Sequence, residues 1–266
     1  MRFHGMTKGN YSNIELTSLM DSIYSHGYES ILLAFQIDNN DPIVSAGFLA
    51  SKYPNIRYMI AIRPYTVSYM HLSLIAKTFY EYYNNKLIIN FVAGTHDEEY
   101  NYFTGKTSSI QERKEMLKEY VDNFINNADG KSYSDIAISG FSKESSFSSK
   151  DSADICIGLF SDLDKIDKDC LGKRVMVRVS IGLNIEKNNA IFDSEREYNN
   201  SICGSKEFII NELCRIESLG VTDILLSSLF SRTSDIDSIH KIVEEFKAGS
   251  KFVFPANITG FNYKPS

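Results

Sequence analysis

Short apolar runs alternate along the chain with longer segments whose apolar residues recur at helical spacing. Residues 14–26 show the helical pattern, whereas the next run, Ser30–Gln36, is apolar on both faces. Strands that are apolar on both faces are typical of a parallel sheet covered by helices. The pattern repeats to near the end of the chain, so we predict an α/β protein.

Eight strands are predicted, at Arg2–Thr7, Ser30–Gln36, Arg57–Pro64, Lys86–Gly94, Asp135–Ser142, Ile155–Phe160, Arg174–Leu183 and Thr222–Ser228. Helices are predicted between them, at residues 14–26, 42–52, 69–83, 109–126, 205–218 and 234–246. Two further stretches, Thr95–Ser108 and Asn184–Ile202, are interpreted as loops of low apolar content.

Eight strand–helix units in about 250 residues fit a (β/α)8 TIM barrel. We see no linker or low-complexity tract, so we predict a single barrel domain over residues 1–266. An open, doubly wound sheet is the structural alternative. Neither a GxGxxG nor a Walker A motif supports that alternative.

The net charge of −6 argues against nucleic acid as the main partner, because such a partner needs a basic patch. No apolar run reaches membrane-spanning length, and the first residues lack the apolar core of a signal peptide. The four cysteines show no CxxC spacing, and no cluster of His, Asp and Glu has metal-ligand spacing. We therefore expect a cytoplasmic protein with reduced cysteines, no metal and no membrane partner.

Active groups of a TIM barrel lie at the carboxyl ends of its strands and in the loops that follow. The polar residues predicted there are His4, Gln36, Arg63, Asn90, Thr95, His96, Ser139, Ser142, Arg178, Ser180, Ser227 and Ser228.

Arg178 lies inside an otherwise apolar strand, so its charge must be paired or must face a polar cavity. It can form an ion pair at the end of the barrel, or it can bind an anion, since guanidinium suits phosphate, sulfonate and carboxylate. Arg63 has the same two interpretations, with the ion pair favoured. His96 is a candidate catalytic residue or an ordinary surface histidine.

Two other features have a structural and a functional interpretation each. The Ser-rich stretch Ser139–Ser146 can cradle a phosphate with its backbone N–H groups, or it can be a solvated turn. Asn90 is an amide in the middle of a buried strand and must find a hydrogen-bond partner there. By contrast, we interpret the acidic run Asp97–Glu99 as solvated, and His71 and His240 as solvent-facing.

The segment Arg57–Gly94 resembles the bacterial luciferase-like family of flavin-dependent monooxygenases, and most nearly its alkanesulfonate monooxygenase branch. The strand ending in Arg-Pro, the helix and the strand KLIINFVAG follow in the family's order and spacing. The resemblance runs from about Tyr28 to Phe246. Its further motifs are the helix QERKEMLKEYVDNFI, the turn ISGFSKES, the segment SADICIG, the strand VMVRVSI and the stretch from Ile202 to Ser228.

The resemblance implies a TIM barrel that uses O2 and reduced FMN, supplied by a separate flavin reductase, to oxidise a small organic substrate. One branch of the family uses the deazaflavin F420 instead, and FMN is favoured here. Asn90 matches a family asparagine that hydrogen-bonds the flavin, and Gly94 ends the same strand. Gly140, Phe141 and Ser142 match the phosphate turn. Arg178 and His96 are the implied catalytic residues, and the family's barrels often pair as homodimers or heterodimers.

The chain also departs from the family pattern. The Arg-x-His of the alkanesulfonate branch reads Arg178-Val179-Ser180, and the cysteine before the second helix is replaced near Asn39. The family's long lid insertion is reduced to the segment Asn184–Ile202. These departures leave the substrate open. They favour, as the alternative, a non-catalytic flavin-binding or partner subunit.

Overall fold

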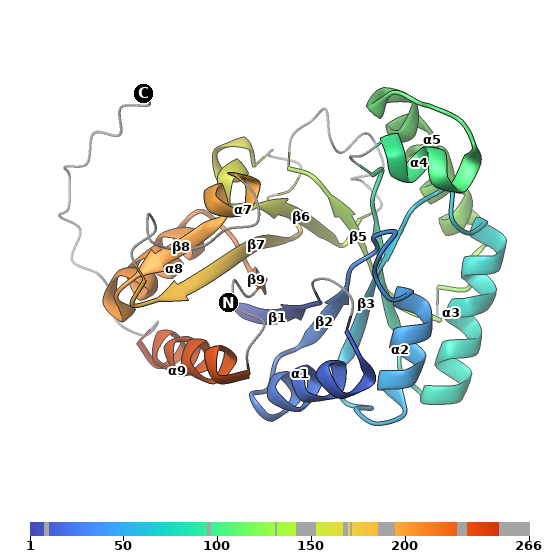
Figure 1. Cartoon of the computed structure of the whole chain (residues 1–266). Coiled ribbons are helices and arrows are strands. Elements are labelled where there is room, and N and C mark those ends of the chain that lie inside the picture. Colours follow the sequence, from blue (N-terminus) through green and yellow to red (C-terminus); the bar gives the residue numbers. More distant parts are fainter. Residues whose placement is uncertain are drawn as a thin grey trace.

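The computed structural model describes residues 1–7, 11–94, 97–130, 132–141, 153–166, 170, 172–185, 195–227 and 233–249. Its strands are β1 (Arg2–Met6), β2 (Ser30–Leu33), β3 (Arg57–Ile62), β4 (Leu87–Phe91), β5 (Tyr133–Ser139), β6 (Ile155–Leu159), β7 (Arg174–Leu183), β8 (Ser201–Gly204) and β9 (Asp223–Leu226). Strands β1 to β7 and β9 pair in parallel and close into a ring, because β9 pairs with both β7 and β1 (Figure 1). The predicted (β/α)8 barrel is confirmed.

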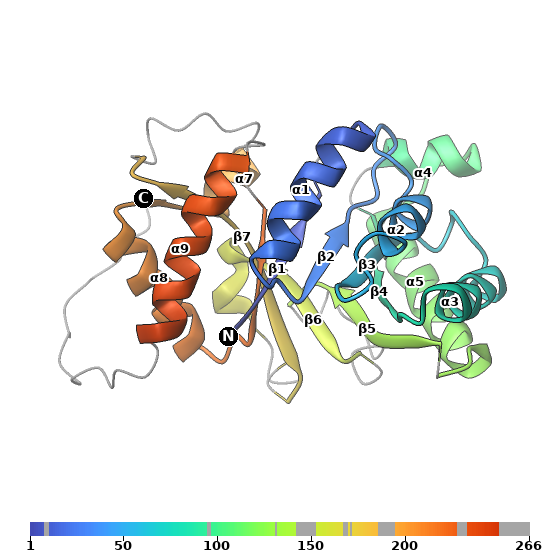
Figure 2. The same cartoon turned by 90° about the horizontal axis from the view of Figure 1, so that it is seen from below.

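The helices flank the ring of strands. They are α1 (Asn13–Ser25), α2 (Pro42–Ala50), α3 (Tyr69–Tyr83), α4 (Asp97–Thr104), α5 (Ile110–Asn127), the short 3-10 helix η2 (Phe160–Lys165), α7 (Glu195–Asn199), α8 (Lys206–Ser218) and α9 (Thr233–Gly249). Helices α1 and α9, from the two ends of the chain, lie side by side over the junction of β1 with β9 (Figure 2). No helix among the described residues is long and apolar enough to cross a membrane.

Both stretches that were interpreted as loops contain regular structure, so those interpretations were wrong. Helix α4 lies in the first stretch, where its charged composition hid it although acidic residues in a first turn favour helix formation. Helix α7 lies in the second stretch, and strand β8 begins at its end. Strand β8 pairs with the last four residues of β7, beyond the part of β7 that belongs to the ring.

Local sequence signals explain where several helices begin and end. Ser12 and Glu15 form a capping box at the start of α1, and Ser109 and Glu112 form another at α5. Helix α3 ends at Asn84, whose φ of 47° is in the left-handed region that asparagine tolerates.

Alternation along the strands divides the apolar residues into two layers. The larger layer packs between the sheet and the helices and includes Val175, Val177 and Val179 of β7. The smaller layer fills the inside of the ring, and its buried members are Leu32, Met59, Ala61, Ile88, Ala137, Ile155, Ile157, Met176 and Leu225. The ring is therefore a packed core, and functional groups must lie at its ends.

The amino-terminal end of the ring is closed by charged and polar groups. The ring of His4 lies between Ser30 Oγ, 2.7 Å from Nδ1, and Asp223 Oδ1, 2.8 Å from Nε2. Asp223 also accepts hydrogen bonds from Arg2 (2.9 Å) and Arg174 (2.7 Å). His4 was predicted among the residues of the active end, and this was wrong, because its partners lie at the starts of β2 and β9.

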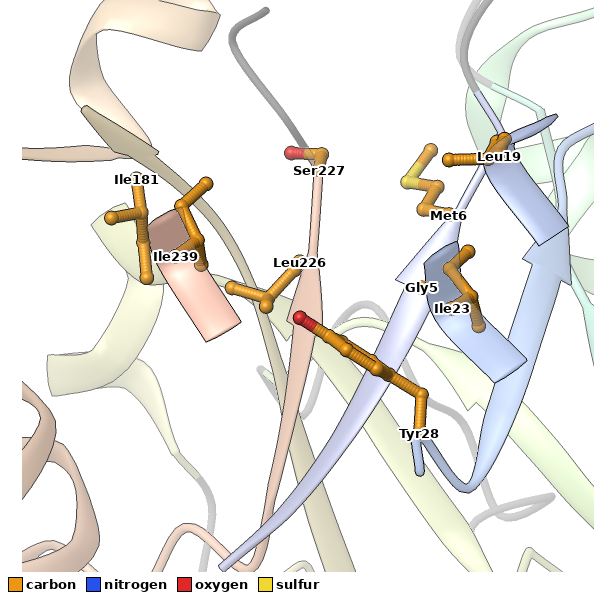
Figure 3. Close-up of a pocket in the computed structure, with 9 residues that line it drawn as sticks. All are labelled: Gly5, Met6, Leu19, Ile23, Tyr28, Ile181, Leu226, Ser227 and Ile239. Carbon is orange, nitrogen blue, oxygen red and sulfur yellow. The ribbon is translucent and has the colours of Figure 1, made fainter. Parts of the chain in front are cut away.

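A small cavity of about 30 Å³ lies behind the junction of β1 with β9, under α1 and α9 (Figure 3). Its walls are mainly apolar, and the hydroxyl of Tyr28 points into it (Figure 3). Tyr28 is 8% exposed, and its hydroxyl makes no hydrogen bond to any described residue. Burial therefore raises the pKa of Tyr28. The cavity has room for about two water molecules.

Replacing Tyr28 with phenylalanine is expected to change the free energy of unfolding by no more than about 0.5 kcal/mol, because no protein hydrogen bond is lost. The matched change is Tyr58→Phe, which removes a buried hydrogen bond of 2.8 Å from the Tyr58 hydroxyl to the carbonyl of Tyr53. That change is expected to cost about 1–2 kcal/mol. Urea denaturation of both variants tests this, and equal losses would contradict it.

Candidate active site

The carboxyl ends of the strands carry the polar side chains that face the inside of the ring. In β7, Arg178 and Ser180 have the same orientation as Met176, which belongs to the inner apolar layer. By the same alternation, Asn90 follows Ile88 in β4 and Ser139 follows Ala137 in β5. The structure thus brings an amide, hydroxyls and a guanidinium to the end of the barrel where TIM-barrel active sites lie.

Asn90 is 3% exposed, and its Oδ1 accepts a hydrogen bond of 3.2 Å from the hydroxyl of Ser139 on the neighbouring strand. Its amide nitrogen makes no hydrogen bond to any described residue. The protein therefore satisfies one of the four hydrogen bonds that the amide can make. Both N–H groups are available to a carbonyl or ring nitrogen of a bound molecule.

The predicted phosphate turn begins where β5 ends. Gly140 has a φ of 124°, which favours glycine, and its N–H donates to the carbonyl of Ile157 at 2.6 Å. The ring of Phe141 is buried in the outer layer against Gly158, where an added Cβ would lie 2.2 Å from the ring. Phe141 therefore anchors the turn with its side chain. The next residue, Ser142, lies outside the described residues.

Arg178 has no hydrogen bond or ion pair with any described residue, so of its two interpretations the ion pair is not found among these residues and the anion contact stays a prediction. Burial lowers the pKa of its guanidinium, and the positive charge of Arg196 on α7 lowers it further, whereas Glu197 opposes the shift. A partly buried cation without a paired carboxylate suits an anionic or electron-rich occupant of the barrel mouth. Beyond Arg178, the hydroxyls of Ser180 and Ser227 are 2.8 Å apart, and one of them donates a hydrogen bond to the other.

Arg63 behaves as predicted, since its Nε donates to Glu99 Oε1 at 2.6 Å. The hydroxyl of Tyr65 donates to the same carboxylate oxygen. Burial and this hydrogen bond raise the pKa of Tyr65. Glu99 was interpreted as solvated, and this was wrong: it is 6% exposed because α4 turns it toward Arg63. No local signal in the acidic run distinguishes Glu99 from its neighbours.

Gly94 has a φ of 84° and lies against this cluster: a Cβ there would be 2.6 Å from the hydroxyl of Tyr65 and 3.3 Å from Glu99 Oε1. A glycine at the end of β4 was predicted to belong to the cofactor site. The structure shows its contact with the Arg63, Tyr65 and Glu99 side chains. Its part in holding a cofactor stays a prediction.

We expect Gly94→Ala to lower the free energy of unfolding by about 2–3 kcal/mol, since left-handed backbone strain and a close contact add up. The matched control is Gly27→Ala, at a φ of 65° where nothing lies within 4 Å of the added Cβ. The control keeps only the backbone strain and is expected to cost about 1 kcal/mol. Guanidinium denaturation separates the two, and losses of the same size would contradict the role of the contact.

The histidine predictions have different outcomes. His96 lies outside the described residues, so its catalytic role stays a prediction. His71 is exposed as predicted. His240 was expected to face solvent, and this was wrong: it is 7% exposed, and its ring centroid is 3.9 Å from that of His26, the residue that follows α1. Contact between the first and last helices buries it.

Among the described residues, one group of side chains is close enough to hold a metal ion: His4, Glu29 and Asp223. This group lies at the amino-terminal end of the ring, away from Asn90 and Arg178. Its carboxylates are already paired with Arg2, Arg57 and Arg174. These arginines supply the compensating charge that a metal would otherwise bring.

Comparison with known proteins gives a fold and no sequence family, since no family model matches the chain. A riboflavin lyase, solved with modified FMN and riboflavin, superposes with a TM-score of 0.77 at 8% identity over 94% of this chain and 92% of its own. An F420-dependent secondary alcohol dehydrogenase superposes with a TM-score of 0.75 at 11% identity, over 92% of this chain and 98% of its own. The EDTA monooxygenase of Chelativorans sp. BNC1 gives 0.73 at 9% identity, over 95% of both chains.

These structures cover nearly the whole chain at low identity, so they establish a common architecture. The barrel fold that the resemblance implies is confirmed, and the luciferase-like family and its alkanesulfonate branch stay predictions. The chain therefore has the (β/α)8 barrel fold of a group of solved enzymes that includes flavin-linked and F420-dependent proteins.

Proposed function

We propose that this protein is a flavin-dependent oxidoreductase that uses reduced FMN and O2 to oxygenate a small organic substrate, with a separate reductase supplying the reduced flavin. The observation that carries the proposal is the pair of unmet polar groups at the barrel mouth. The amide nitrogen of Asn90 and the guanidinium of Arg178 both lack partners among the described residues. Both can donate hydrogen bonds to an occupant with acceptor atoms.

The residues present fit a flavin. The ring system offers carbonyl and ring-nitrogen acceptors to Asn90. We assign the phosphate to the turn that follows Gly140, where Ser142 lies outside the described residues and the N–H of Gly140 already donates to Ile157. When it is bound, reduced flavin supplies the reaction with O2. The protein's part is to hold the ring at the mouth, to place Arg178 beside electron-rich atoms and to exclude water. F420 is the second candidate cofactor, because an F420-dependent enzyme shares the fold.

The test is an anaerobic titration of the full chain with reduced FMN, oxidised FMN and F420. We expect tight binding of reduced FMN, followed by substrate-dependent O2 consumption when a flavin reductase and a substrate are added. Tight binding of F420 alone would move the protein to deazaflavin chemistry. Absence of binding by all three would overturn the proposal.

The residues at the carboxyl end of β7 favour a second function. In that function, the protein is a non-catalytic flavin-binding or partner subunit. Ser180 stands where the resemblance calls for histidine, and its hydroxyl is engaged with Ser227. Neither hydroxyl offers a proton-transfer group near neutral pH. Normal turnover by the isolated chain would exclude this function. Activity that appears only after addition of a second barrel protein would support it.

A further inference from the structure

A cleft of about 290 Å³ opens at the carboxyl-terminal edge of the barrel, beside the mouth. It lies between the loop that follows β2, the loop that follows β3 and helix α4, so three separate βα segments form it. Its volume is close to the lower end of the range for small-molecule sites, and loops at this end of a TIM barrel usually bind substrate.

The walls of the cleft are largely aromatic and aliphatic. The ring centroids of Phe35 and Phe103 are 5.6 Å apart, and those of Tyr102 and Phe103 are 5.1 Å apart. Ile37 is 38% exposed and Phe103 is 42% exposed, so apolar surface is available to a ligand. A ring or a branched hydrocarbon is the kind of group that such walls bind.

The charges around the cleft argue against an anionic ligand. Among the residues that the structure describes, no Lys, Arg or His lines the cleft, and Asp41 is the one charged residue in its lining. The Asp41 carboxylate caps α2 through the N–H groups of Ile43 and Val44. The nearest guanidinium, that of Arg63 stacked 5.7 Å from the ring of Phe35, is paired with Glu99. A sulfonate or carboxylate would meet a like charge and no free cation.

One polar side chain in the lining of the cleft lacks a hydrogen bond. Asn39 lines the cleft and also a cavity of about 10 Å³ beside Thr7 and Tyr11, and its buried amide nitrogen has no hydrogen-bond acceptor among the described residues. A buried donor without an acceptor is rare in folded proteins and calls for a water molecule or a ligand atom. A carbonyl or ether oxygen of a ligand would supply the missing acceptor if the Asn39 side chain turns its amide nitrogen toward the cleft.

We propose that this cleft binds the substrate of the proposed oxidoreductase, and that the substrate is a neutral, ring-containing organic molecule with one hydrogen-bond acceptor. That the ligand is a substrate rests on the proposed function. The chemical class of the ligand rests on the cleft alone. The proposal excludes alkanesulfonates as substrates, because the cleft selects against the sulfonate group.

The test compares three probes that share one ring: acetophenone, benzoate and benzenesulfonate. Isothermal titration calorimetry on the full chain without flavin is expected to show acetophenone binding at least tenfold more tightly than either anion. Asn39→Ala and Phe103→Ala are each expected to weaken acetophenone binding by about fivefold or more. The control Tyr82→Ala, at a 77% exposed side chain on α3 outside the cleft, is expected to leave it unchanged.

Equal or tighter binding of benzenesulfonate would overturn the proposal, and so would unchanged acetophenone binding in both cleft variants. Phe103 is partly exposed, so its truncation leaves a folded chain for the comparison even where Asn39→Ala unfolds. The anaerobic flavin titration is read separately. If acetophenone binds and no flavin binds, the proposed function and the substrate role are overturned, and the ligand class of the cleft is retained. If flavin binds and acetophenone is not preferred over the anions, only the cleft proposal is overturned.

Discussion

Replacing Asp223 with asparagine is expected to lower the free energy of unfolding by about 3–5 kcal/mol, which is the usual cost of breaking a buried ionic network on one side. Asp223 is fully buried and accepts hydrogen bonds from His4, Arg2, Arg174 and Thr222. Asparagine keeps the shape and loses the charge, so two arginines are left without this counter-ion. Urea denaturation at neutral pH measures the loss.

The same group predicts an acid transition. Burial alone would raise the pKa of Asp223, but hydrogen bonds from His4, Arg174 and Thr222 and the charge of Arg174 hold it well below its usual value. The stabilisation is therefore fully present above the unfolded pKa of 3.8 and is lost as the pH falls below it, because the unfolded chain takes up the proton first. The asparagine variant is expected to show a flatter dependence of stability on pH below about 4.

An exposed ion pair provides the control for this change. Glu81 lies on the surface of α3 near Lys77, at 3.8 Å, and both side chains are more than half exposed. Glu81→Gln is expected to change the free energy of unfolding by less than about 0.5 kcal/mol. Equal losses in the two variants would mean that the ionic network around Asp223 contributes no more to the free energy of unfolding than a surface ion pair does.

Replacing Asn90 with alanine is expected to weaken the binding of reduced FMN by about tenfold to a hundredfold. The expected loss corresponds to one or two buried hydrogen bonds, at about 1.4 kcal/mol for each factor of ten. The physical reason is the amide nitrogen, which makes no hydrogen bond to a described residue and faces the barrel mouth. Anaerobic fluorescence titration of the wild type and the variant measures the change.

Two further variants serve as the control and the comparison for the Asn90→Ala result. Asn55→Ala removes an exposed amide that hydrogen-bonds Tyr24, at the opposite end of the strands, and is expected to leave flavin binding unchanged. Ser139→Ala removes the protein's own partner of Asn90 and is expected to weaken binding less than Asn90→Ala does, since the amide itself remains. If flavin binds equally well to the wild type and to Asn90→Ala, Asn90 has only a structural role and the flavin lies elsewhere.

The sequence determined the architecture of this protein. All eight predicted barrel strands are present, because each is a short apolar run bounded by turn residues and the helices between them carry an apolar face. The sequence also singled out Asn90 and Arg178 as polar residues inside apolar strands, and the structure then placed both on the inner side of the ring. These signals are local, so a single sequence was enough to detect them.

Only the tertiary structure decided which polar groups are paired. Glu99 belongs to an acidic run that looks solvated, yet α4 places it under Arg63 and Tyr65. His4 looks like an active-end residue, yet the register of β1 with β2 and β9 places it in the charged layer at the other end. The cleft between the loops after β2 and β3 and α4 is likewise invisible along the chain. Pairing and cavities depend on contacts between residues that are distant in sequence, and burial sets the free-energy cost of a group left unpaired, so neither can be determined without the folded chain.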